Sequence, residues 1–135
     1  MASQFVFDAI GTHWIIDISD SITKETEETL LSQIMERIRV FDESYSRFRS
    51  DSLVTKMSEI SGQYKLPDDA QVMMSLYREI YDLTDGLVTP LIGQTLIDAG
   101  YDAGYSLIQK NKLNQPPSWA DAITYNHPIL DVHIP

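Results

Sequence analysis

The sequence predicts an α+β fold, in which an antiparallel sheet packs with two long and two short helices. Three observations support this fold class. Runs of β-branched and aromatic residues gather near both ends of the chain, apolar residues between them recur at helical spacing, and the two kinds of element do not alternate strictly. A chain of 135 residues suits a single domain with a hydrophobic core. We therefore expect one domain over residues 1–135.

The first elements are predicted to be two strands over residues 5–18. Aromatic residues alternate with other residues in the first piece, and the second piece, from Trp14 onward, is rich in isoleucine. Between the two pieces lie Gly11 and Thr12, where the glycine permits a bend or a close approach of the backbone.

A long helix is predicted from Thr23, which suits an N-cap, to about Phe41. Glutamates fill its first turns, where the partial positive charge of a helix N-terminus favours them. Arg37 and Arg39 are assigned to the last turns, where a helix favours cations. Apolar residues recur at three- and four-residue steps and make one stripe: Leu30, Leu31, Ile34, Ile38 and Phe41.

The segment that follows contains a short helix. Residues 42–51 are polar, charged and aromatic, which predicts a loop or an extension of the long helix. Ser52 or Asp51 is suited to cap the short helix, and Gly62 to close it. Residues 64–66 are predicted to form a short extended link.

A second long helix is predicted to start at Asp68, with Gln71 completing a capping box. Asp85 and Gly86 are expected to end it, since a glycine accepts the left-handed backbone of a helix C-terminus. Its apolar face is assigned to Val72, Met73, Leu76, Ile80 and Leu83.

The remaining elements are shorter. Residues 87–93 are predicted to be extended and to enter a short helix that ends near Ala99. Glycines and tyrosines predict a loop over residues 100–105, and polar residues with two prolines predict a linker over residues 109–118. Two final strands are expected, over residues 119–125 and 129–134.

The charge of the chain bounds its partners. The formal net charge is -10 and the pI is about 4.5, so the chain repels phosphate backbones and anionic lipid surfaces. We expect no nucleic-acid partner. The acid excess is explained by solubility, or, in the alternative, by carboxylates that help to hold a divalent cation.

No apolar run approaches the roughly 20 residues of a membrane-spanning helix, and the first residues lack the pattern of a signal peptide. We expect a cytoplasmic protein without a membrane span, although a removed export signal would leave the same sequence. The chain has no cysteine, which excludes disulfides, thiolate metal sites and a cysteine nucleophile. The three histidines lack metal-binding spacing, and no metal ligand is assigned: His13, His127 and His133.

The most unusual stretch lies just past the first long helix, over residues 44–52. It combines hydroxyls, two arginines and two aromatic side chains. Arginine makes forked hydrogen bonds to phosphate and stacks on planar rings, so the stretch could hold a nucleotide. The alternative is a polar connection between helices, whose arginines pair with local acids. The glycines at 11, 86 and 93 are open to the same two interpretations, because glycine serves both close ligand approach and ordinary turns.

Three segments, in this order, resemble the N-terminal half of the FAD:protein FMN transferase (ApbE) family. Residues 7–18 resemble the family's opening strand and its Met-Gly-Thr turn. Residues 41–52 resemble its pattern of an aspartate, a serine, a Phe-Arg pair and an Asp-Ser pair. Residues 86–93 resemble its Gly-x-Phe-Asp-Pro-Thr-Val-Gly stretch. The resemblance covers most of residues 5–105.

The sequence departs from the family's pattern at several positions. Ile10 stands in place of methionine, Thr89 in place of the aspartate before the proline, and Leu91 in place of the threonine after it. Further departures are at Leu53, Ser58 and Ala99. The family's later Asp-x-Gly-x-x-x-Lys-Gly motif and its metal site are absent, and residues 129–134 resemble the strand just before them. We expect the N-terminal portion of an ApbE-like domain without its C-terminal half, as a fragment or a shortened gene product.

The resemblance implies a magnesium-dependent transfer of FMN from FAD to a threonine or serine hydroxyl of an acceptor protein, with release of AMP. In that case this chain supplies flavin and nucleotide contacts and is expected to be inactive alone; no catalytic residue is assigned. The implied contacts are Ile10, Gly11 and Thr12 by the flavin, Tyr45, Ser46, Arg47, Phe48, Arg49 and Ser52 by the nucleotide, and Gly86, Thr89, Pro90 and Gly93 along the pocket.

Two alternatives remain open: a catalytically inactive FAD-binding module, and a non-flavin interaction domain with the same fold. The exposed strand edges of a half-domain also favour a homo-oligomer.

Overall fold

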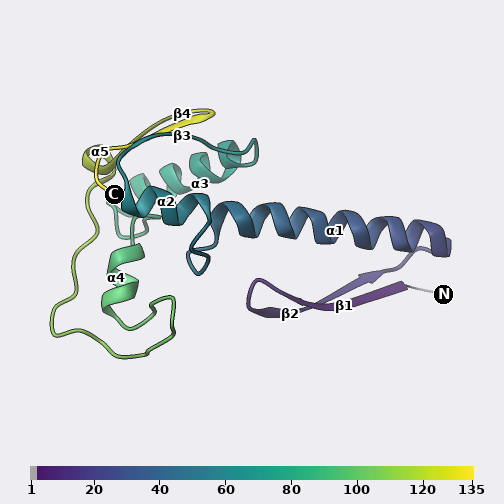
Figure 1. The fold of residues 1–135 in the computed structure, drawn as a ribbon. Helices are drawn as coiled ribbons and strands as arrows, with labels where there is room; N and C mark the ends of the chain where they lie inside the picture. The colour runs from purple at the N-terminus through teal and green to yellow at the C-terminus, as the bar shows by residue number, and fades with distance from the viewer. Residues whose placement is uncertain (1–2) are drawn as a thin grey trace. The chain divides into compact units, whose positions relative to one another are not determined.

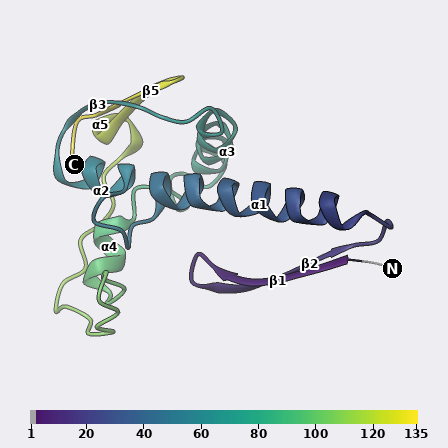
Figure 2. The ribbon, with the colours of Figure 1, turned by 45° about the vertical axis from the view of Figure 1, so that its right-hand side comes forward.

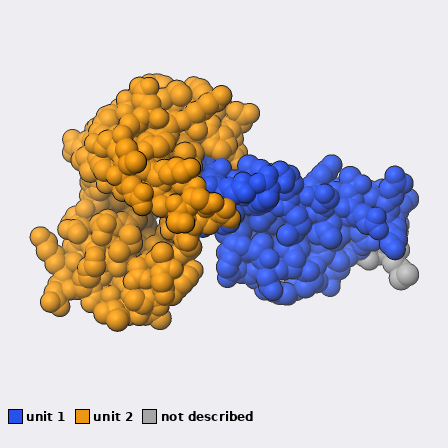
Figure 3. Space-filling model, viewed as in Figure 1, with its two compact units in different colours: residues 1–46 blue, residues 47–135 orange. Residues whose placement is uncertain are grey.

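The computed structural model describes residues 3–135, which divide into two compact units (Figure 3). The first unit ends at Ser46 and the second comprises Arg47–Pro135. Each unit contains its own small antiparallel sheet, so the predicted single sheet is in fact two. The α+β fold class is confirmed (Figure 1). Within the described residues, no helix is both long and apolar enough to cross a membrane.

The first unit begins with a hairpin of β1 (Ser3–Ala9) and β2 (Thr12–Ile18). The strands pair from Ser3 with Ile18 to Ala9 with Thr12, which leaves a two-residue turn. Ile10 and Gly11 form that turn, with φ of 52° and 69°. Two successive positive φ values are the geometry that suits the twist of a hairpin. The predicted strands are confirmed, but the turn lies one residue earlier than expected, because Thr12 already belongs to β2.

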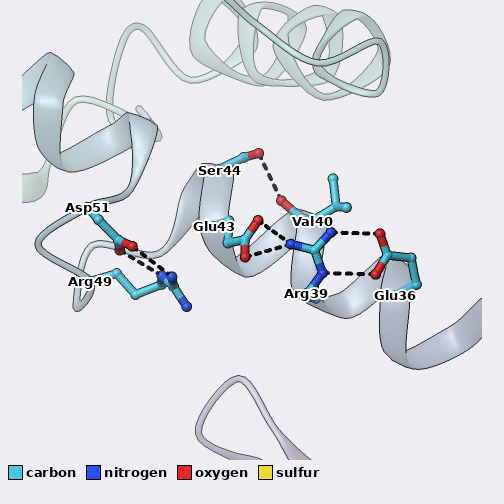
Figure 4. A network of polar contacts seen from close by, with 7 residues as sticks. All are labelled: Glu36, Arg39, Val40, Glu43, Ser44, Arg49 and Asp51. Atoms are coloured by element: carbon cyan, nitrogen blue, oxygen red, sulfur yellow. Dashed lines mark hydrogen bonds and ion pairs between the residues drawn. The ribbon is translucent and has the colours of Figure 1, made fainter. Parts of the chain in front are cut away.

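Helix α1 (Lys24–Tyr45) follows, and its predicted N-cap is confirmed, since the Thr23 hydroxyl accepts from the Thr26 amide at 3.2 Å. The helix continues past Phe41 to Tyr45, so residues 42–45 extend it. The assignment of the two arginines to its last turn was wrong, because that turn holds no basic residue. Arg39 instead donates to carboxylates one turn away on either side, at 2.7 Å from Glu36 and 2.6 Å from Glu43 (Figure 4).

The apolar stripe of α1 lies against β2 and leaves a groove of about 290 Å³ between them. Its lining is almost entirely apolar: Trp14, Ile16, Leu30, Ile34 and Ile38, with Gln33 and Arg37. No residue of α1 is buried, and Phe5 is the buried apolar residue among those described in this unit.

The second unit contains α2 (Leu53–Glu59) and a sheet of β3 (Gly62–Lys65), β5 (Ile129–Val132) and β4 (Ile123–Asn126), in that spatial order. All of its pairings are antiparallel. Ser52, and not Asp51, caps α2. The helix ends at Glu59 with Ile60 as its C-cap, and Gly62 does not close it but opens β3.

Helix α3 (Ala70–Leu83) contributes Ala70 and Met74 to the core of this unit. Its N-cap is Asp69, with no side-chain cap bond, so the capping box at Asp68 was wrong. Its end is as predicted, because Asp85 and Gly86 have φ of 50° and 79° and the Gly86 amide donates to the Tyr81 carbonyl at 2.8 Å.

The apolar face assigned to α3 was also wrong. Ala70 and Met74 are buried, with Tyr77 and Tyr81 packed beside them. On the face that was predicted, Val72, Leu76 and Leu83 are exposed by 77%, 55% and 77%. The error has a simple cause: α3 has apolar or aromatic residues on two faces, and spacing alone does not tell which one meets the sheet.

The C-terminal part contains α4 (Gly93–Asp98), a long irregular segment, and α5 (Trp119–Ala122). Helix α5 replaces the start of the predicted strand over 119–125, because Ser118 caps it through the Asp121 amide at 3.2 Å. The view in Figure 2 shows α5 beside β3 and β5. The core formed here joins α3, α5 and the sheet: Leu66, Ala70, Met74, Trp119, Ala122, Ile123, Leu130 and Val132.

Candidate functional site

Arg47 and Phe48 form the most developed part of the candidate site, and both belong to the second unit. The Arg47 guanidinium lies over the Phe48 ring, 4.3 Å from its centroid. Phe48 also stacks on Tyr105, with centroids 4.8 Å apart and planes 14° from parallel. The Arg47 Nη1 donates to the Tyr101 carbonyl oxygen at 2.5 Å. Two side chains from the segment after α1 are therefore held by the loop that follows α4.

That loop, residues 100–114, is called the strap below. It has no helix or strand and follows a long path away from α4 (Figures 1 and 2). Within it, the Asp102 carboxylate accepts from the Gly104 and Ser106 amides at 2.9 and 3.1 Å, and from the Ser106 hydroxyl. The bonds from Ser106 lower the pKa of Asp102 below its ordinary value.

Arg49 makes a two-pronged ion pair with Asp51. Its Nε lies 3.0 Å from one carboxylate oxygen and its Nη2 lies 2.9 Å from the other (Figure 4). These bonds hold the pKa of Asp51 below its ordinary value. Pairing of an arginine with a local acid is what the structural interpretation of this stretch expects. A contact of Arg49 with a ligand stays a prediction.

Ser52 is fully buried and its hydroxyl is used locally. The hydroxyl oxygen accepts from the Thr55 amide at 3.1 Å and contacts the Thr55 hydroxyl at 3.0 Å. The Thr55 hydroxyl in turn donates to the Arg49 carbonyl at 2.6 Å. Ser52 thus helps to fix the backbone at Arg49, through Thr55. Its contact with a ligand stays a prediction.

The segment from Gly86 to Gly93 contains two predicted residues with local roles. Thr89 is 7% exposed, and its hydroxyl oxygen accepts from the Leu91 amide at 3.2 Å. Gly86 has a left-handed backbone, and a Cβ there would lie 3.2 Å from the Tyr81 ring. Pro90 is half-buried, whereas Gly93 starts α4, and a Cβ added there would meet no atom within 4 Å.

The other predicted contacts belong to the first unit. Ile10 and Gly11 form the exposed hairpin turn, and Thr12 donates to the Ala9 carbonyl at 3.2 Å. Tyr45 ends α1, and its ring lies 4.9 Å from that of Phe41. Ser46 is the C-cap of the same helix, and its amide donates to the Asp42 carbonyl at 3.0 Å.

Among residues 3–135, no group of three or more histidine, aspartate or glutamate side chains is arranged to hold a metal ion. Sequence reasoning missed three residues that organise the site: Asp98, Tyr101 and Tyr105. A signal was present for one of them, because Asp98 is an acid that directly follows Leu96 and Ile97 in a short apolar helix. Tyr105 lies in the stretch of glycines and tyrosines for which the sequence predicts only a loop, so nothing there indicated its contact with Phe48.

Comparison with solved structures places this fold. The chain superimposes with a TM-score of 0.80 and 14% identity on a variant of the flavin transferase ApbE from Vibrio cholerae, covering 100% of this chain and 49% of that one. For the ApbE protein from Thermotoga maritima the TM-score is 0.73 and the identity 16%, and the match covers 98% of this chain and 45% of that one. For the apo form of the flavinyl transferase ApbE from Pseudomonas stutzeri the TM-score is 0.68 and the identity 15%, and the match covers 99% of this chain and 46% of that one.

No protein-family model and no curated protein sequence matches the chain. At these identities the structural likeness shows the fold, and the chain spans about half the length of each of these proteins. Residues 3–135 therefore have the fold of about half of an ApbE flavin transferase, as the resemblance in the sequence predicted.

Proposed function

We propose that this chain is the N-terminal, ligand-binding portion of a protein that transfers FMN from FAD to a threonine or serine hydroxyl of an acceptor protein. The observation that supports this most is the likeness to a flavin transferase over the whole chain, at a TM-score of 0.80. The order and spacing of the three sequence segments described above support it independently.

In this reaction the acceptor hydroxyl oxygen forms a bond to the phosphorus of the FMN moiety. The bond between that phosphorus and the bridging pyrophosphate oxygen breaks, AMP leaves, and the hydroxyl proton passes to a base. Such a transfer depends mainly on positioning and on neutralising the charge on the phosphoryl oxygens. The share of this chain in the reaction is to bind FAD and orient it.

Arg47 and Phe48 are suited to binding and orienting FAD. A guanidinium has five N–H donors in a planar fork, and the bond to the Tyr101 carbonyl uses one of those of Arg47. Phe48 is 42% exposed, so its ring is accessible beside that cation. A cation and an exposed ring held together match the phosphate and the flat ring system of a flavin nucleotide.

Magnesium does not fit the residues described here. Three acids near the candidate site are already bonded to protein donors: Asp51 to Arg49, Asp98 to Lys110, and Asp102 to Ser106. Among residues 3–135, no three histidine, aspartate or glutamate side chains lie together as a metal site would require. We therefore derive no step through a metal from this chain.

A second candidate is an FAD-binding module without transferase activity. It is favoured by Thr89, which stands where the family pattern has an aspartate and whose hydroxyl oxygen is bonded to the Leu91 amide. A buried threonine cannot supply the charge of a carboxylate.

Binding of FAD is tested by titrating it into the 135-residue chain and following flavin fluorescence, with and without magnesium. We expect saturable binding that Arg47→Ala weakens and that Arg39→Ala leaves unchanged. Arg39→Ala is a matched control because it removes the same positive charge, from a side chain that forms two exposed ion pairs on α1. Equal affinities of the two variants would argue against the proposed site.

Chemistry is tested separately, by AMP release from FAD in the longest chain that the gene encodes. Release that requires magnesium supports the transferase. Saturable FAD binding without release supports the inactive module, and absence of both supports the interaction domain.

We also propose a cytoplasmic location, FAD and an acceptor protein as partners, and self-association through the sheet edges. β3 and β4 are the outer strands of their sheet, which is the feature that supports pairing with another chain. A concentration-independent monomer in light scattering would contradict self-association.

A further inference from the structure

A buried carboxylate lies at the end of α4, where the strap begins. Asp98 is 1% exposed, and four donors bond its carboxylate. On one oxygen these are the Gln94 amide at 2.8 Å and the Lys110 ammonium at 2.8 Å. On the other they are the backbone and side-chain amides of Asn114, at 3.0 and 2.8 Å. Lys110 and Asn114 belong to the strap, so this side chain helps to tie its far end to α4. The Thr95 hydroxyl, which donates to the Asn114 carbonyl at 2.7 Å, and the Lys110 amide, which donates to the Asp98 carbonyl at 2.8 Å, hold the same end.

The strap is also closed on itself near its start. Gly100 has φ of 98°, and a Cβ there would lie 2.7 Å from the Ile108 nitrogen. The Leu107 amide donates to the Gly100 carbonyl at 3.0 Å. Tyr105 and Leu107 have positive φ of 50° and 54°, which bulky residues adopt only when their surroundings impose it.

Burial of apolar side chains does not impose the positive φ of Tyr105 and Leu107. The apolar side chains of the strap are largely exposed: Tyr101 by 51%, Tyr105 by 57%, Leu107 by 68% and Ile108 by 73%. A segment with so little buried surface is held mainly by its polar contacts. Among them, the bonds to Asp98 have a buried acceptor, although their donors on the strap are exposed.

The strap carries the two groups that hold the candidate ligand-binding side chains. The Tyr101 carbonyl accepts from Arg47, and the Tyr105 ring stacks on Phe48. A movement of the strap would therefore shift at once the carbonyl that holds Arg47 and the ring that holds Phe48.

We propose that Asp98 is a positioning residue, which holds Arg47 and Phe48 in place through the strap without touching the ligand itself. The physical coupling stands on the contacts within this unit. Its consequence for FAD rests on the proposed function above.

The coupling is tested without any ligand, by comparing Asp98→Asn with the unaltered chain. In the variant the strap loses its buried charge partner for Lys110. We expect hydrogen exchange of the Leu107 amide to accelerate roughly tenfold or more, since bonds to a charged group are among the stronger ones. Nuclear Overhauser contacts between the Phe48 and Tyr105 rings should weaken in parallel.

Two further variants keep the result interpretable. Lys110→Met removes the ion pair through a side chain that is 57% exposed, and should reproduce the effect in smaller measure if Asp98→Asn fails to fold. Asp82→Asn makes the same replacement at an exposed ion pair on α3, and should change nothing in the strap. Unchanged exchange and unchanged ring contacts in both Asp98→Asn and Lys110→Met would overturn the coupling.

Titration of FAD then addresses the functional part. If the unaltered chain binds FAD, Asp98→Asn should weaken binding while Asp82→Asn does not. Equal or tighter binding by Asp98→Asn would overturn the positioning role toward FAD. Absence of FAD binding by the unaltered chain contradicts the proposed function, whereas the coupling is still decided by the exchange and ring contacts.

Discussion

The rings of Phe48 and Tyr105 stack with their centroids 4.8 Å apart, although the two residues are 57 positions apart in the sequence. Both rings are well exposed, at 42% and 57%. An exposed aromatic pair next to a guanidinium is a surface on which a flat ring can stack.

Replacement of Tyr105 tests whether this stack helps to bind FAD. Stacked aromatic pairs contribute about 0.5–1.5 kcal/mol, so Tyr105→Leu should weaken FAD binding by roughly two- to tenfold in a fluorescence titration. Tyr105→Phe keeps the ring and should bind as the unaltered chain does. Tighter binding by Tyr105→Leu would mean that Tyr105 blocks the face of Phe48 that the ligand needs.

The buried hydroxyl of Ser52 should matter for stability. It caps α2 through the Thr55 amide, and loss of an N-cap costs about 0.5–2 kcal/mol. Ser52→Ala should lower the free energy of unfolding by an amount in that range in urea denaturation. Ser58 is exposed on α2, so Ser58→Ala should change the free energy of unfolding by close to zero. Equal effects of the two changes would contradict the capping role.

The hairpin turn contains a strained residue. Ile10 is β-branched and has φ of 52°, a backbone that costs a branched side chain about 1 kcal/mol or more. Since Asn-Gly is the preferred sequence for this turn, Ile10→Asn should slow hydrogen exchange of the paired β1 and β2 amides. Ile15→Asn, the same replacement inside β2, should accelerate it. Faster exchange in Ile10→Asn would show that the turn is not under strain.

The strap should respond to acid in a defined range. Bonds from Lys110 and the surrounding amides hold the pKa of Asp98 well below its ordinary value. A depressed carboxyl pKa adds stability that is complete above the unfolded-state pKa and is lost as the pH falls through the folded-state pKa. Protection of the Leu107 amide, corrected for intrinsic exchange, should therefore stay constant down to about pH 4.5 and fall below about pH 4.

Asp102 also has a lowered pKa and lies in the strap, so the comparison must isolate Asp98. Asp98→Asn should lose the part of the acid response that belongs to Asp98, whereas Asp102→Asn should retain it. The same pH dependence in Asp98→Asn and the unaltered chain would contradict this assignment.

Local signals in the sequence predicted the elements that depend on local chemistry. The threonine cap of α1, the serine cap of α2 and the glycine end of α3 are all present. Each is a contact among residues a few positions apart, which is why spacing and residue type were enough to find them.

Features that depend on distant residues were not predictable in this way. The buried face of α3 is decided by the sheet of β3, β5 and β4, two strands of which lie at the far end of the chain. The stretch around Arg47 was identified from its composition, but its partners, Tyr101 and Tyr105, are brought to it only by the fold. Asp98 was missed because three of its four donors, from Lys110 and Asn114, lie in a segment that looked like a linker.

The most direct test of the central claim is a titration of FAD into the isotope-labelled 135-residue chain, followed by amide chemical shifts. We predict saturable shifts at Arg47, Phe48 and Tyr105. Saturable shifts that avoid these residues, or no shift at millimolar FAD, would contradict it.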